Sequence, residues 1–180
     1  IGGFVWWLPP DLDLWARWSQ LGLFSPTMHV QGGGTSLLKI PKTCIHTWPR
    51  GSHIWRKLAK LRMTLLPYIY TLAHEAHDTG IPLLRHHLLD FANDATAVSQ
   101  PYQFSFGKSL LVAPVVTPRT DNRTVYLPVL PAGQHWIDVS SVLNYDVSDG
   151  RHRIGYSSLR TGGQYITVDA PLDTVPFFVR

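Results

Sequence analysis

The longest periodic segment of this 180-residue chain runs from Ser52 to Gly80. Apolar residues recur there at spacings of three and four, the pattern of a helix that packs one face on a large apolar partner. Ser52 is a candidate N-cap, and Gly80, followed by Ile81-Pro82, is a candidate stop. Pro67 predicts a kink or a break near Met63. The stripe comprises Ile54, Trp55, Leu58, Leu61, Leu65, Tyr68, Ile69, Leu72 and Ala76.

The part of the chain before this helix alternates between strand and helix patterns. Ile1–Val5 has the composition of a buried strand, and Asp11 or Asp13 is expected to cap a helix that ends at Gly22. Leu23–Val30 is a second short apolar run, which we predict to be a strand. Such β–α repetition predicts a parallel sheet or barrel, in which the loops that follow the strands carry the chemistry.

From about Pro82 the pattern changes to short apolar or alternating runs, separated by Gly, Pro, Asn and Asp. This spacing is typical of an antiparallel β-sandwich. We place the domain boundary near Asn93, which gives one domain over residues 1–92 and a second over residues 93–180. The predicted strands are Tyr102–Phe106, Leu110–Val116, Thr124–Leu127, His135–Val139, Gln164–Asp169 and Thr174–Val179.

Composition narrows the function classes. The net charge of +4 is modest and the basic residues are scattered, apart from Arg56–Arg62, so the sequence does not predict a nucleic-acid partner. The single cysteine, Cys44, excludes an internal disulfide and a cysteine-rich zinc site. No apolar run has the length of a membrane span, and we expect no membrane partner. The basic side chains beside the helical stripe are expected to face solvent: Arg56, Lys57, Lys60 and Arg62.

Several collinear stretches resemble glycoside hydrolase family 31, and together they cover nearly the whole chain. They match the family's segments D-I-G-G-F, E-L-x-x-R-W-x-Q-L-G-x-F-x-P, L-R-Y-x-L-L-P-Y-x-Y-T-L, G-x-P-x-x-R and Q-F-x-x-G-x-x-L-L-V-A-P-V. In this sequence the matching stretches are Ile1–Phe4, Asp13–Pro26, Leu61–Leu72, Gly80–Arg85, Gln103–Val115, Tyr126–Pro128, Gly133–Asp138 and Val175–Arg180.

The resemblance implies the C-terminal strands and helices of a (β/α)8 TIM barrel, followed by the family's proximal C-terminal β-sandwich domain, an α/β fold joined to an all-β one. It also implies a retaining α-glycosidase that hydrolyses O-glycosidic bonds of α-linked sugars through two Asp residues, a nucleophile and an acid/base. In the family both lie on earlier barrel strands. We therefore expect no catalytic residue in this chain and no activity from the chain alone. The implied partners are the remainder of the catalytic barrel and an α-linked oligosaccharide or glycoside. This chemistry needs no cofactor or metal.

One departure from the family bears on the substrate. After F-x-P the family usually carries R-x-H beside the sugar, whereas this sequence has His29 and Gln31 at those positions. A weaker donor and a neutral amide change the hydrogen bonding to sugar hydroxyls, which leaves a glucoside, a xyloside or a galactoside open. Phe4, Trp6 and Trp7 are candidates for an apolar sugar platform. The alternative for all five residues is packing between loops.

A second interpretation, from a different class, is a non-catalytic carbohydrate-binding or structural β-sandwich module. The first 92 residues argue against it, because a closed (β/α)8 barrel takes about 250 residues. Strand edges and the apolar face of the long helix would then lack partners. A nucleophile strand and a second acidic loop upstream would decide for the enzyme.

Overall fold

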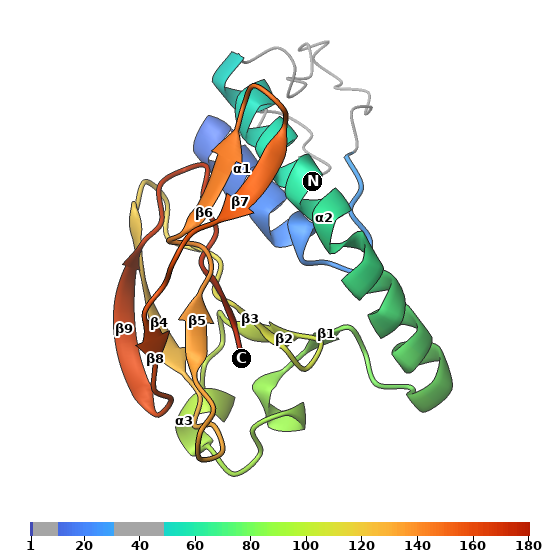
Figure 1. The fold of residues 1–180 in the computed structure, drawn as a ribbon, viewed down its shortest axis with the longest axis vertical. Coiled ribbons are helices and arrows are strands. Elements are labelled where there is room, and N and C mark those ends of the chain that lie inside the picture. The colour runs from blue at the N-terminus through green and yellow to red at the C-terminus, as the bar shows by residue number, and fades with distance from the viewer. Residues whose placement is uncertain (2–10, 31–48) are drawn as a thin grey trace, which may run out of the picture.

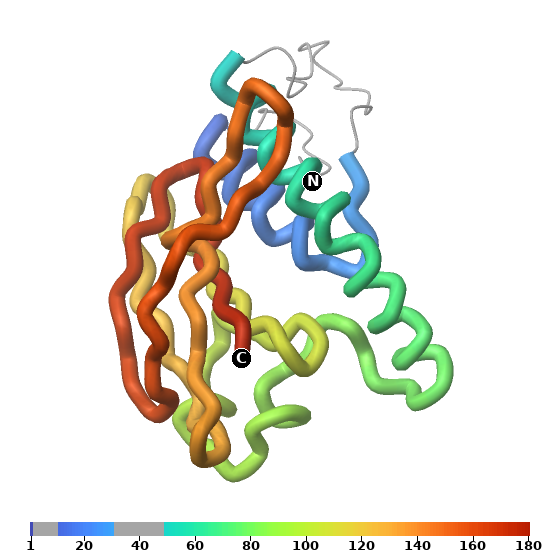
Figure 2. The backbone as a smooth tube through the Cα atoms, viewed as in Figure 1, coloured from blue at the N-terminus to red at the C-terminus, as the bar shows by residue number. Residues whose placement is uncertain are grey.

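The computed structural model describes residue 1, residues 11–30 and residues 49–180. Two helices, α1 (Leu12–Leu23) and α2 (Pro49–Thr79), lie on one side of the molecule, and the β-strands lie on the other (Figure 1). The backbone tube in Figure 2 follows α2 as one uninterrupted helix that extends beyond the strands. Apart from Ile1, the predicted first strand lies outside the described residues.

Helix α1 begins where the sequence predicts. Asp11 is its N-cap, and the carboxylate accepts a hydrogen bond from the backbone N–H of Leu14 at 2.8 Å. The helix continues past the predicted stop at Gly22 to Leu23. The predicted strand over Leu23–Val30 is wrong, because the residues after Leu23 form turns and irregular chain. A strand needs a paired neighbour, and the described chain supplies only one bond from Ile1 N to His29 O, at 2.6 Å.

Helix α2 is the predicted long helix, with a different start. It begins at Pro49, a residue favoured in the first helical turn, so Ser52 lies inside the helix instead of capping it. The predicted end is confirmed, because Gly80 follows the last helical residue with a φ of 74°. Pro67 does not break the helix. The residues that α2 buries lie on both sides of Pro67, so packing holds the two halves in one line.

Two basic side chains of α2 correct the expectation that its charges face solvent. Lys57 forms an ion pair with Asp173, with 2.8 Å between Nζ and Oδ2. Arg62 is partly buried and donates hydrogen bonds to backbone carbonyls that follow α1 and close its last turn. Arg56 and Lys60 are exposed, as predicted.

All paired strands are antiparallel, in agreement with the predicted β-sandwich. The six predicted runs each contain or overlap an observed strand, and four further strands were not predicted: β1, β6, β7 and β8. A six-stranded sheet has the order β1-β2-β3-β10-β5-β8, while β4 pairs with β9 and β6 pairs with β7. The bounds are β1 Leu84–Arg85, β2 Phe104–Phe106, β3 Leu110–Val112, β4 Asn122–Leu127, β5 Trp136–Asp138, β6 Leu143–Asp146, β7 Arg151–Ile154, β8 Leu159–Arg160, β9 Gln164–Asp169 and β10 Phe177–Val179. Two short helices, η2 (His87–Leu89) and α3 (Ala95–Val98), lie between β1 and β2.

The middle of the six-stranded sheet is buried on both faces, whereas β8 at its edge is exposed. Successive residues of a strand point to opposite faces, and β3 and β10 follow this alternation. Leu110 and Phe177 belong to a core shared with α1 and α2, whereas Leu111 and Phe178 belong to a second core shared with β4. The molecule therefore has three layers, namely helices, a central sheet and the β4–β9 pair. The domain boundary at residue 93 stays a prediction.

The described helices bear on the prediction that the chain has no membrane span. None of them combines the length and the apolar composition that a membrane crossing requires.

Candidate functional site

The structure places one of the five predicted substrate-binding residues. Phe4, Trp6, Trp7 and Gln31 lie outside the described residues. His29 is exposed. Together with residues of α1 and of the turn that follows α1, it lines an open hollow of about 220 Å³. The sugar-contacting role of all five residues therefore stays a prediction.

The turn that leads to His29 is held by a residue that the sequence analysis placed in solvent. The guanidinium of Arg62 donates to the carbonyls of Leu23 at 2.7 Å, Ser25 at 2.8 Å and Pro26 at 2.9 Å, and more weakly to Gly22 at 3.3 Å. Burial lowers the pKa of Arg62. The sequence does contain a signal for the partial burial of Arg62. This residue lies four positions after Leu58 and therefore on the edge of the apolar stripe.

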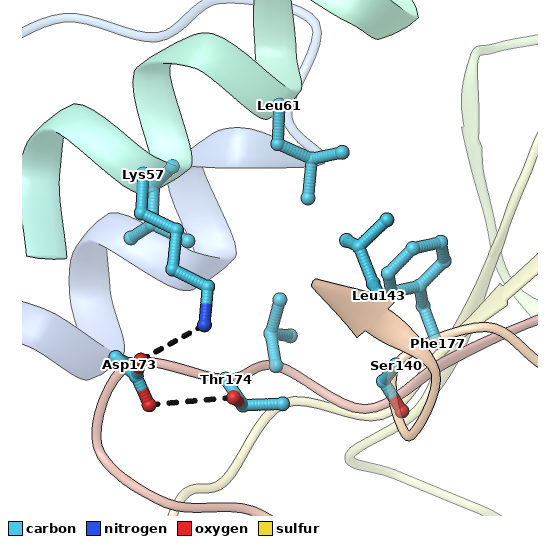
Figure 3. Close-up of a pocket in the computed structure, with 9 residues that line it drawn as sticks. Lys57, Leu61, Ser140, Leu143, Asp173, Thr174 and Phe177 are labelled. Atoms are coloured by element: carbon cyan, nitrogen blue, oxygen red, sulfur yellow. Dashed lines mark hydrogen bonds and ion pairs between the residues drawn. The ribbon is translucent and has the colours of Figure 1, made fainter. Parts of the chain in front are cut away.

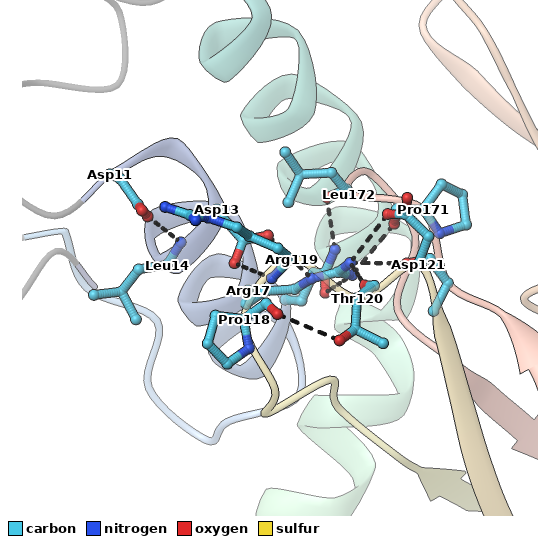
Figure 4. A network of polar contacts seen from close by, with 12 residues as sticks. Asp11, Asp13, Leu14, Arg17, Pro118, Arg119, Thr120, Asp121, Pro171 and Leu172 are labelled. Carbon is cyan, nitrogen blue, oxygen red and sulfur yellow. Dashed lines mark hydrogen bonds and ion pairs between the residues drawn. The ribbon is translucent and has the colours of Figure 1, made fainter.

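A second arginine, Arg17, joins α1 to the β-strands (Figure 4). Its side chain is 7% exposed, and its Nη2 donates to the carbonyls of Thr120 at 2.7 Å and Ala170 at 2.8 Å. Two longer bonds run from Nη1 to the carbonyls of Pro171 and Thr174. These acceptors lie just before β4 and after β9, so one side chain fixes two loops against one helix.

The joint between α2 and the strands contains a small cavity (Figure 3). Lys57 and Asp173 form its polar side, and Leu61, Leu143 and Phe177 line its apolar side. The volume is about 20 Å³, which suits one water molecule and is too small for a sugar ring. This cavity is therefore part of the packing and not a substrate site.

Five of the described carboxyl groups have a shifted pKa, and the shift is downward in each. A glycosidase general acid needs a raised pKa, but each carboxyl whose pKa is shifted in the described chain has it lowered: Glu75, Asp94, Asp146, Asp149 and Asp173. Asp146 and Asp149 are adjacent on the β6–β7 hairpin. The pKa of Asp146 is lowered first by the Ser148 hydroxyl, and that of Asp149 by Arg153, which donates to both carboxylates. They form a surface charge cluster.

One histidine is buried and neutral. Burial lowers the pKa of His87 to about 4, and the proximity of His86 adds to the effect. Gln103 Oε1 accepts from the backbone N–H of Tyr126 at 3.1 Å, which turns the Gln103 amide nitrogen toward His87 Nε2 at 3.2 Å. Nε2 is therefore the acceptor, and Nδ1 carries the hydrogen that faces Ser105 Oγ at 3.2 Å. This network holds η2 against β2 and β4.

The described residues also bear on metal ligation. Those residues contain no group of three or more His, Cys, Asp or Glu side chains arranged to hold a metal ion.

Family models match both parts of the chain. Residues 1–72 match the model described as "Glycosyl hydrolases family 31 TIM-barrel domain", and residues 80–180 match "Glycosyl hydrolase family 31 C-terminal domain". Each match falls on one of the two regions that the fold distinguishes, the helices and the strands.

Curated relatives match over nearly the whole chain. Lysosomal alpha-glucosidase of Rattus norvegicus is 34% identical over 172 residues, which are 93% of this chain and 17% of that protein. Isomaltosyltransferase of Sporosarcina globispora is 30% identical over 179 residues, which are 95% of this chain and 14% of the transferase. The chain thus spans less than a fifth of the length of these two relatives.

A solved structure has the same fold over this region. The GH31 dextranase of Flavobacterium johnsoniae, in a complex with isomaltotriose, superposes with a TM-score of 0.73 and 36% sequence identity. The match covers 94% of this chain and 18% of the dextranase chain.

Proposed function

Because this chain belongs to glycosyl hydrolase family 31, we propose that it is the C-terminal portion of a retaining α-glycosidase that hydrolyses O-glycosidic bonds of α-linked sugars. The nucleophile and the acid/base Asp lie upstream, on barrel strands that precede Ile1. The portion described here forms part of the wall around the cleaved bond and the β-sandwich that supports the barrel. By itself it is inactive.

The observation that carries this proposal is the state of the carboxyl groups. A retaining enzyme holds two carboxyl groups about 5–5.5 Å apart, and one of them must keep its proton at working pH. Among the described residues, Asp94 and Asp173 accept hydrogen bonds inside the fold, and Asp146 and Asp149 are bound to Arg153. These groups are committed to structure, so the catalytic pair is expected elsewhere in a longer protein.

The helices supply a second observation, an apolar surface that lacks a cover within the described residues. Leu14, Trp18 and Leu21 are spaced by four and three on α1 and are 52%, 38% and 37% exposed. Met63, Leu66 and Tyr70 are spaced by three and four on α2 and are 62%, 47% and 65% exposed. We assign these faces to the remainder of the catalytic barrel, with which helices of a (β/α)8 barrel pack.

Substrate contacts are assigned to Phe4, Trp6, Trp7, His29 and Gln31. The hydrogen bond from Ile1 N to His29 O, at 2.6 Å, supports a common location for the start of the chain and the segment that carries His29. Isomaltotriose in the dextranase complex makes an α-linked oligosaccharide the expected class of ligand. His29 and Gln31 would donate and accept hydrogen bonds with the sugar hydroxyls.

The test is hydrolysis of aryl α-glycosides (glucoside, xyloside, galactoside and N-acetylgalactosaminide) by the longer protein beside this chain alone. We expect turnover in the longer protein and none in this chain. Turnover by this chain would place a catalytic pair within it and would overturn the proposal. Absence of turnover in both, together with binding of this chain to an α-glucan, would support the non-catalytic module.

A double substitution tests the substrate contacts within the same assay. His29→Arg with Gln31→His restores the family's residue types, and we expect it to change the ratio of kcat/KM values for glucoside and xyloside by about tenfold or more, since each charge-assisted hydrogen bond contributes about 1.5–3 kcal/mol. Arg56→Ala, an exposed change on α2, is the control. An unchanged ratio would remove His29 and Gln31 from the site.

A further inference from the structure

The guanidinium of Arg62 donates hydrogen bonds to several carbonyls at the point where the chain leaves α1 toward His29. Nη1 donates to Leu23 O at 2.7 Å and Ser25 O at 2.8 Å, and Nη2 donates to Pro26 O at 2.9 Å. Two of these acceptors lie beyond the helix, so the bonds reach past the end of α1 into the turn. The side chain therefore fixes the path of the backbone, in addition to satisfying the last carbonyls of the helix.

The arrangement needs a guanidinium. The carbonyl end of a helix carries a partial negative charge, which a cation stabilises. A planar fork can serve several carbonyls from two nitrogens, whereas an ammonium group offers one nitrogen on a flexible stem. Ser25 shows the connection to the site, because its carbonyl accepts from Arg62 while the residue lines the hollow beside His29.

Only Thr27 and Met28 separate the last carbonyl that Arg62 holds, that of Pro26, from His29. Two residues allow little freedom, so the position of His29 depends on how firmly the turn is held. We propose that Arg62 is a positioning residue for substrate binding, which sets the place of His29 by holding residues 22–26 through its guanidinium. This inference rests on the function proposed above, in which His29 contacts the sugar.

Amide hydrogen exchange on this chain tests the local part of the inference. In Arg62→Ala we expect exchange of the amides of Phe24 and Ser25, which donate to the carbonyls of Leu21 and Gly22, to become about tenfold faster or more, because the hydrogen bonds that hold this turn to a charged group are lost. The amides of β4 and β9 should keep their protection. Arg62→Lys should behave like Arg62→Ala, whereas Arg56→Ala should behave like the wild type. Unchanged exchange at Phe24 and Ser25 would overturn the inference, whether or not the longer protein is active.

Chemical rescue in the longer protein separates positioning from stability. We expect Arg62→Ala to lower kcat/KM for an aryl α-glycoside by about a hundredfold, the size of effect that a misplacement of about 1 Å produces. Low millimolar guanidinium, far below denaturing concentrations, should restore much of this loss by donating to the same carbonyls, whereas methylammonium should not. A melting temperature that falls with no change in kcat/KM, or equal rescue by both cations, would reduce Arg62 to a structural residue.

The two proposals fail in different ways. If the wild-type longer protein hydrolyses none of the glycosides, the proposed function fails, and the exchange experiment still decides whether Arg62 holds the turn. If the wild type is active and Arg62→Ala retains its full kcat/KM, the proposed function stands and this inference is overturned.

Discussion

The helices and the strands of this chain differ in how completely their apolar surfaces are covered. The middle of the central sheet is covered on both faces, by α1 and α2 on one side and by β4 and β9 on the other. Each long helix is covered on one face only, and its opposite face exposes apolar side chains such as Trp18 and Met63. The core on both sides of the sheet is therefore complete within this chain. The exposed apolar faces of α1 and α2, in contrast, lack a packing partner among the described residues.

The two regions are nevertheless joined tightly, and polar side chains make the joint. Arg17 connects α1 to the loops beside β4 and β9, and Lys57 connects α2 to Asp173. These contacts stand beside a shared apolar core that includes Leu58 and Phe177. The difference in closure therefore does not imply independent folding, and we expect the helices and the central sheet to unfold together.

The largest test of this joint is Arg17→Met. The substitution leaves the buried carbonyl of Ala170 and that of Thr120 without their donor, and two hydrogen bonds to a charged group contribute about 3–6 kcal/mol together. Chemical denaturation should show this loss in the free energy of unfolding. Arg56→Met is the matched control and should change it by less than about 0.5 kcal/mol.

The same experiment tests whether the regions unfold together. Far-UV circular dichroism reports mainly the helices, and the fluorescence of Trp136, buried in the strands, can be isolated by replacing the other tryptophans. In this single-tryptophan variant the two signals should change at the same denaturant concentration. Separate midpoints in the variant would contradict the shared core.

Much of the strand region could be predicted from the sequence, because short alternating runs between turn residues carry a local signal. Gln164–Asp169 was predicted to the residue. The β6–β7 hairpin was missed, since its strands are mostly polar and exposed, as at Arg151 and Arg153. The strand predicted at Leu23–Val30 failed because strand formation depends on a partner, and the pairing is limited to Ile1 among the described residues.

The candidate site was less predictable, because its contacts also join residues that are far apart in the sequence. The residue types at positions 29 and 31 identify a departure from the family, but no local pattern gives the role of a long side chain such as that of Arg62. Its bonds end on carbonyls about 40 residues earlier in the chain, and only the packing of α1 on α2 brings them together. Arg17 forms a long ion pair with Asp13, four residues earlier, at 4.0 Å between Nε and Oδ1, but its short contacts are with carbonyls of distant loops.

Lowering the pH should have an effect of intermediate size on the unfolding free energy, and this effect arises in the strand region. The pKa of His87 is about 4 in the folded chain and about 6.5 when unfolded, so the folded state favours the neutral ring. Its contribution is fully present above pH 6.5 and is lost as the pH falls from 6.5 to 4, by at most about 3 kcal/mol. Unfolding free energies of wild type and His87→Gln should therefore converge between pH 7 and pH 4.

The choice of glutamine keeps the test specific. Its amide can accept from Gln103 and donate to Ser105, as the neutral histidine does, but it does not titrate in this range. His77→Gln, an exposed change on α2, should leave the pH dependence as it is in the wild type. A constant difference between wild type and His87→Gln across this range would show that His87 gains its proton without cost.

The smallest effect is expected where the two regions differ most, on the uncovered face of α2. Met63→Gln with Leu66→Gln should change the free energy of unfolding of this chain by less than about 0.5 kcal/mol, because both side chains are already largely in water. Leu58→Ala, on the buried face of the same helix, should cost about 2–5 kcal/mol. In the longer protein the exposed pair should become costly as well, by about 1–3 kcal/mol for each buried amide. The difference between the cost in this chain and the cost in the longer protein measures how far this face of α2 is buried in the longer protein. An equally small cost in the longer protein would mean that the face is exposed to solvent there too.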